Sequence, residues 1–87
     1  MTRVGHYHPG MARIRNLDQV SANSSAHPTE TDAEWTVVDA GDTKLLQIST
    51  FGSDSRVSER KVSQTIQFDR RSAMVLKAAI ESAFPGI

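Results

Sequence analysis

The strongest constraint on the fold is an alternation of side-chain types over residues 61–69 (KVSQTIQFD). Side chains that are mostly apolar occupy every second position: Val62, Gln64, Ile66 and Phe68. The positions between them carry polar side chains: Lys61, Ser63, Thr65 and Gln67. This period of two is typical of a β-strand with one buried face, because neighbouring side chains of a strand point to opposite sides. We therefore expect the first set to pack inward, with Gln64 as the exception, and the second set to face solvent.

Two segments before this strand are also rich in strand-forming residues, namely residues 35–39 (WTVVD) and 45–51 (LLQISTF). Between them, Gly41 tolerates positive φ and Asp42 can bond its own backbone, which indicates a turn. Residues 52–60 (GSDSRVSER) are polar and rich in turn-forming residues. The sequence thus predicts a hairpin, a loop of about nine residues and a third strand.

A C-terminal helix should follow the third strand directly. Asp69 is a good N-cap for a helix that starts at Arg70. The next residues place a connected apolar stripe on one side: Ala73, Leu76, Ala79, Ile80, Ala83 and Phe84. Pro85 disfavours helical geometry at Phe84 and so ends the helix. We predict an α+β fold, in which a small antiparallel sheet of three to four strands is followed by one helix that covers one face.

The first third of the chain shows no periodic pattern. Residues 21–34 (SANSSAHPTETDAE) contain almost no large apolar side chains, so they bury too little surface to offset the entropy of ordering. Residues 13–20 have apolar side chains at the spacing of one short helical turn. We predict a disordered N-terminal tail over residues 1–34 and a folded domain over residues 35–87.

Composition narrows the possible functions. The chain has 87 residues and no cysteine, and a chain this short buries a small core, so dimerisation is the natural way to complete it. His6 and His8 have no further ligand nearby in the sequence, so we expect no metal and no cofactor. No catalytic motif is present, so we do not expect an enzyme. Neither a signal peptide nor an apolar run of about 20 residues is present, so we expect a cytoplasmic protein.

Residues 44–84 resemble the bacterial and phage branch of the transcriptional positive cofactor four family. The resemblance depends on the segments 48–51 (ISTF) and 61–68 (KVSQTIQF), which are separated by a polar loop and followed by a terminal helix. It implies an antiparallel sheet with one helix, a homodimer formed through that C-terminal helix, and binding of single-stranded DNA.

The charges of the chain are unevenly distributed, which agrees with a polyanion ligand. Residues 1–43 hold three basic and six acidic side chains, whereas residues 44–87 hold seven basic and four acidic ones. Four basic residues are candidates for phosphate contacts: Lys44, Arg56, Arg60 and Lys61. Five polar side chains are candidates for contacts with bases or sugars: Gln47, Ser49, Ser63, Thr65 and Gln67. Phe51 is the candidate stacking platform.

Each of these assignments has a structural alternative. The basic loop can be an ordinary solvated connection in which Asp54 and Glu59 are partners of the arginines, and Phe51 can be buried under the tail or at a dimer contact. Trp35 fits core packing better than base stacking. Arg70 and Arg71 stand at the start of the helix, where they either contact a phosphate or are simply solvated.

The predicted function is binding of single-stranded nucleic acid with little sequence specificity, with a role in modulating transcription. The alternative is a protein-interaction module that uses the sheet edge or the acidic residues 21–43 and binds no nucleic acid. A third hypothesis is that residues 1–34 fold back over the basic surface and regulate it.

Overall fold

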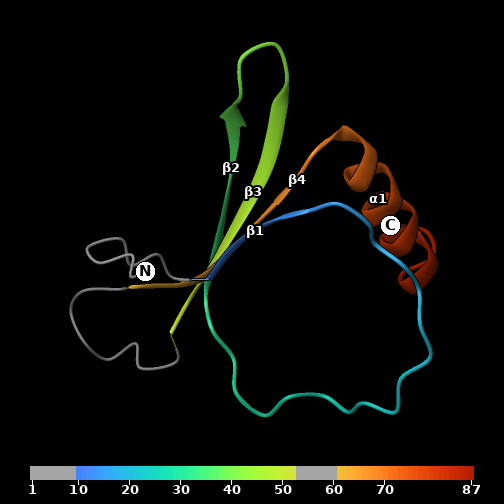
Figure 1. Ribbon diagram of the computed structural model, residues 1–87. Helices are drawn as coiled ribbons and strands as arrows, with labels where there is room; N and C mark the ends of the chain where they lie inside the picture. The colour runs from blue at the N-terminus through green and yellow to red at the C-terminus, as the bar shows by residue number, and fades with distance from the viewer. Residues whose placement is uncertain (1–9, 53–60) are drawn as a thin grey trace, which may run out of the picture.

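A single four-stranded sheet and one helix form the fold, in a computed structural model that describes residues 10–52 and 61–87. The elements in chain order are β1 (Gly10–Ile14), β2 (Ala33–Asp39), β3 (Lys44–Phe51), β4 (Val62–Phe68) and α1 (Arg70–Ala83). The strands lie in the order β1-β4-β3-β2, and the helix lies on one side of them (Figure 1). The predicted α+β fold, with a small sheet followed by one C-terminal helix, is confirmed.

The three predicted strands form the antiparallel part of the sheet. β2 and β3 make a hairpin whose turn has Gly41 at φ 85°, a conformation that glycine adopts without a steric penalty. β3 then pairs with β4, with Leu46 opposite Phe68 and a register shift between Thr50 and Phe51. Most of the predicted loop over residues 52–60 lies outside the described residues.

The fourth strand, β1, was not predicted, and it makes the sheet mixed. Residues 10–14 had been placed in the disordered tail, and residues 13–20 in a short helical turn. Instead, β1 pairs in parallel with β4, with Met11 beside Thr65 and Ile14 beside Phe68. The five residues GMARI carry no alternation of their own, so their strand conformation comes from the free edge that β4 offers. From β1, the chain runs in a wide arc over residues 15–32 to reach β2 (Figure 1).

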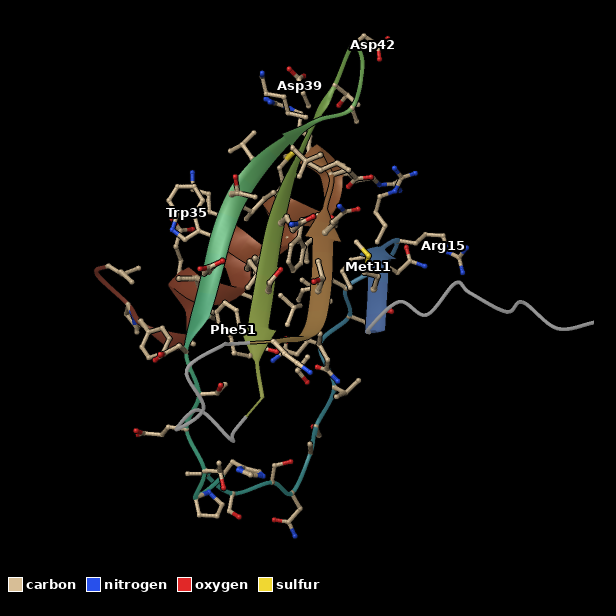
Figure 2. All side chains as sticks on the ribbon, turned by 90° about the vertical axis from the view of Figure 1, so that its left-hand side faces the viewer. Met11, Arg15, Trp35, Asp39, Asp42 and Phe51 are labelled. Atoms are coloured by element: carbon tan, nitrogen blue, oxygen red, sulfur yellow. The ribbon has the colours of Figure 1, made fainter. Side chains whose placement is uncertain are left out.

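The two faces of the sheet differ in what covers them. We call the side that carries Leu46, Ile48, Ile66 and Phe68 the helix face, because Leu46 lines one hollow together with Ala73, Leu76 and Ile80 of α1. We call the opposite side, which carries Leu45, Gln47, Ser49, Thr65 and Gln67, the open face. In Figure 2 the viewer looks at the open face, and the helix lies behind the sheet.

The core is small and is divided between different parts of the sheet. Phe68 lies on the helix face at the end of β4, whereas Leu45 is on the open face and Phe51 lies at the other end of the β3–β4 pair. Among the described residues, the buried apolar side chains are Leu45, Phe51 and Phe68. Asp69 alone separates β4 from α1, and the helix diverges from the sheet after its first turns (Figure 1). Ile66 is on the helix face as predicted, but it remains 37% exposed. Val62 is equally exposed, so the prediction that this side of β4 is packed inward holds for Phe68 and is wrong for Val62 and Ile66.

Candidate nucleic-acid interface

The centre of the open face is a row of polar side chains that bond to one another. Register places Ser49 opposite Thr65 and Gln47 opposite Gln67 on the two inner strands. The hydroxyls of Ser49 and Thr65 are 3.0 Å apart, and Nε2 of Gln67 donates to Oε1 of Gln47 at 2.8 Å. These four predicted site residues are thus brought together, but each already has a partner within the sheet.

The hydroxyl pair does not face solvent, which corrects the prediction. Ser49 and Thr65 are buried, with Thr65 only 6% exposed. Both are short side chains on inner strands, and their outer neighbours in the same row are the longer Glu34 of β2 and Met11 of β1. Because the two hydroxyls are buried and bond to each other, this pair joins the two strands and is not a ligand contact.

The two glutamines keep bonding capacity for a ligand. Gln47 and Gln67 are half-buried. An amide has two N–H donors and an oxygen with two lone pairs, and the bond between these residues uses one donor of Gln67 and one lone pair of Gln47. Their remaining groups are the ones on this row that can contact a base or a sugar.

Phe51 does not serve as a stacking platform in this structure. It is 8% exposed, so its ring has no free face for a base. Its backbone is also held in place, since its N–H donates to the carbonyl of Asp32 at 3.2 Å and its carbonyl accepts from the hydroxyl of Thr31. The structural alternative, in which Phe51 is buried, is the one that the structure supports.

The predicted phosphate contacts lie in different places. Lys44 is paired with Asp39 at 3.9 Å, and both side chains are largely exposed, so the pair is weak. Lys61 and Ser63 are exposed at the beginning of β4. Arg56 and Arg60 lie outside the described residues.

The structure adds a cluster of arginines that the sequence analysis missed. Because β1 and β4 are parallel, both strands end at the same edge of the sheet, and Arg13 lies beside Gln67. Arg15 follows the end of β1 (Figure 2), while Arg71 follows the end of β4. We call Arg13, Arg15 and Arg71 the arginine cluster. The only sequence signal for it was the spacing of Arg13 and Arg15, which suits one side of a strand.

Asp69 lies near two members of this cluster, Arg13 and Arg71, and its carboxylate is bonded within the helix cap. Its carboxylate accepts from the backbone N–H of Ser72 at 2.9 Å, and the Ser72 hydroxyl bonds back to the N–H of Asp69 at 3.1 Å, which forms a capping box. These hydrogen bonds lower the pKa of Asp69 below 3.8, and the positive charges of Arg13 and Arg71 lower it further. The effect of Arg13 on a residue 56 positions away in sequence reflects the parallel pairing of β1 with β4.

The lowered pKa of Asp69 predicts a loss of stability in acid. A group whose pKa is lower in the folded state contributes stability that is complete well above 3.8 and is lost as the pH falls from there through the folded-state value. Thermal unfolding of the wild type should therefore show a melting temperature that falls over this range. Asp69→Asn is the matched control, because asparagine also caps helices but does not titrate. An equally steep fall in Asp69→Asn would show that other carboxylates cause the effect.

A second group of cations lies on the other side of the molecule. Lys44, Arg70 and Lys77 line a hollow of about 570 Å³ between the β2–β3 turn and α1, together with Asp42. Arg70 and Arg71 are consecutive residues of α1, but Arg70 lines this hollow, whereas Arg71 belongs to the arginine cluster. This hollow is an alternative binding site for an anion. Because Lys77 lines the hollow and is not part of the arginine cluster, a substitution of Lys77 tests this site alone.

Two further properties concern the described residues as a set. They contain no helix with the length and apolar character needed to cross a lipid bilayer. They also contain no group of three or more histidine, cysteine or acidic side chains arranged to hold a metal ion.

Comparison of the chain with known protein families, with curated proteins and with solved structures found no match.

Proposed function

We propose that this chain binds single-stranded nucleic acid with little sequence specificity, through the open face and the arginine cluster. The observation that carries the proposal is the parallel pairing of β1 with β4, which gathers Arg13, Arg15 and Arg71 at one end of a polar sheet face that the helix does not cover. Guanidinium groups bind phosphate with two parallel hydrogen bonds. A protein surface that follows the phosphate backbone of a nucleic acid needs several such groups in a row.

The contacts would divide by chemistry. The arginine cluster would bind phosphates, while the spare amide groups of Gln47 and Gln67 would contact bases or sugars. With Phe51 buried, the proposal assigns no aromatic ring to this surface, so affinity would come mainly from phosphate contacts and would fall steeply with salt.

Three finer features belong to this proposal. They are a role in modulating transcription, a cytoplasmic location, and a homodimer formed through the C-terminal helix. The exposed apolar side chains of Ile80 and Phe84 on and after α1 support the last of them. All three agree with the resemblance of residues 44–84 to the positive cofactor four family.

Removing two members of the arginine cluster should weaken binding and its salt dependence together. Each phosphate contact on a single strand contributes about 0.7 to the slope of log K against log salt, so Arg13→Ala with Arg15→Ala should lower that slope by about 1.4. The measurement is fluorescence anisotropy of labelled oligo-dT, titrated at several salt concentrations. A parallel titration with a duplex of the same length tests the preference for single strands.

Lys77→Ala is the matched control, because it removes one exposed cation from the hollow on the helix side. It should leave binding by the open face unchanged. If Lys77→Ala weakens binding and the double arginine variant does not, the ligand occupies the hollow and the proposed interface is wrong. If the wild type binds no oligonucleotide even at low salt, the proposed function is wrong.

A further inference from the structure

The outer edge of β2 pairs with no other strand among the described residues. β2 lies at the end of the sheet and has seven residues, AEWTVVD, without proline, lysine or a bulge. Proteins that remain monomeric usually protect such an edge with one of these devices, because free N–H and C=O groups are a template for another strand. Trp35 is 71% exposed and Val37 is 55% exposed on the helix face of this strand.

The hydrogen bonds of the hairpin identify which backbone groups are directed outward. Ala40 bonds to Thr43, and Phe51 bonds to Asp32, at the two ends of the β2–β3 ladder. Bonding alternates along an antiparallel pair, so the even-numbered residues of β2 bond to β3. The outward N–H and C=O groups therefore belong to Ala33, Trp35, Val37 and Asp39.

The helix face of β2 needs an apolar cover that its own helix does not provide. The exposure of Trp35 and Ile66 shows that α1 leaves this part of the sheet uncovered. Exposed apolar side chains also occur at the C-terminal end of α1 and just after it, namely Ile80, Phe84 and Ile87. Figure 2 shows the C-terminal end of the chain emerging beyond β2, on the side where a strand added to that edge would lie.

We infer that β2 pairs with β2 of a second copy of this chain, in antiparallel orientation and centred on Thr36. This two-fold pairing joins the two sheets into one continuous sheet with both helices on the same side. The C-terminal end of each helix then lies under the strands of the other copy, so the helix contact of the homodimer proposed above belongs to the same interface, and the inference rests on that proposed homodimer. One chain thus supplies both the free edge and the cover for it, which favours a second copy over an unrelated strand.

The register follows from side-chain chemistry. Centring on Thr36 places Trp35 of each copy opposite Val37 of the other, an aromatic and β-branched pair of the kind that stabilises sheets. Glu34 then faces Val38, and Asp39 faces Ala33, so no like charges are opposite each other. A register centred on Val37 would place Trp35 opposite Asp39, and one centred on Trp35 would leave Asp39 beyond the end of the partner strand.

A single cysteine at the two-fold centre tests the register directly, because the natural chain has none. Thr36 would meet its copy as a non-hydrogen-bonded pair with Cα atoms about 4.5 Å apart, within the range that a disulfide spans. Under mild oxidation, Thr36→Cys should form a covalent dimer on a non-reducing gel. Glu34→Cys is the matched control, because its two copies would be about 14 Å apart and should not form a disulfide. Equal cross-linking of both variants, or of neither, would overturn the inference.

Sizing by light scattering tests the same interface without a covalent bond. The wild type should have twice the 9.5 kDa mass of the chain. Val37→Lys places a charge against Trp35 of the other copy and should give a monomer, whereas Met74→Lys, on an exposed part of the helix, should leave a dimer. A monomeric wild type, or a Val37→Lys dimer, contradicts the inference. Failure of Val37→Lys to fold leaves the cysteine pair as the deciding experiment.

Discussion

Phe68→Ala should lower the free energy of unfolding by about 3–5 kcal/mol, the range for truncating a buried aromatic side chain. Phe68 is 4% exposed and lies between Leu46 of β3 and Ile14 of β1, below the first turns of α1. With few buried apolar residues in the described chain, neighbouring side chains cannot collapse far into the space that the ring leaves. The measurement is urea unfolding followed by circular dichroism at one fixed protein concentration, since dimerisation makes apparent stability depend on concentration.

Met74→Ala is the control for this substitution. Met74 is exposed on α1, and alanine is the best helix former, so its truncation should change stability by no more than about 0.5 kcal/mol. If the two variants lose equal stability, Phe68 is not the residue that fixes the helix on the sheet. If Phe68→Ala keeps its helical signal but unfolds without a cooperative transition, the contact between helix and sheet would be what makes the fold two-state.

Thr65→Val should cost about 1–3 kcal/mol, because it leaves the buried hydroxyl of Ser49 without its partner. Valine has nearly the shape of threonine, so packing changes little and the loss reports on the hydrogen bond. The double variant Ser49→Ala with Thr65→Val removes both polar groups and should recover most of the loss, since replacing both partners is close to neutral. The coupling energy from this double-mutant cycle isolates the pair.

Ser63→Ala is the control for the hydroxyl experiment. Ser63 is on the same strand as Thr65 but exposed, so the loss of its hydroxyl should change stability by no more than about 0.5 kcal/mol. If Thr65→Val is as mild as Ser63→Ala, the Ser49 hydroxyl reaches water and the centre of the open face is wetter than the structure shows. The ligand surface would then regain the hydroxyl groups that the sequence analysis had assigned to it.

The elements that the sequence predicted are those whose signals are local. The alternation over residues 61–69 identified β4, and the turn signal around Gly41 identified the β2–β3 hairpin. Asp69 was predicted as the N-cap, and the structure confirms it with a capping box that includes Ser72. Each of these features depends on residues within a few positions of one another, so a single sequence contains the information.

The features that the sequence did not predict depend on partners far away in the chain. β1 is a strand only because β4 has a free edge, and its five residues show no alternation. The neighbour of Thr65 across the sheet is Met11, which was not expected to be in the sheet at all. The arginine cluster was missed for the same reason, because Arg13 meets Arg71 only through the parallel pairing.

The parallel pairing of β1 with β4 also determines the stage of synthesis at which the sheet can form. Gly10 pairs with Gln64, and the 53 residues between them include the whole hairpin. During synthesis, the N-terminal strand leaves the ribosome long before its partner has been made. The cationic end of the sheet cannot assemble until the last third of the chain is available, so a translation product that stops before β4 contains Arg13 and Arg15 but cannot place them beside Arg71.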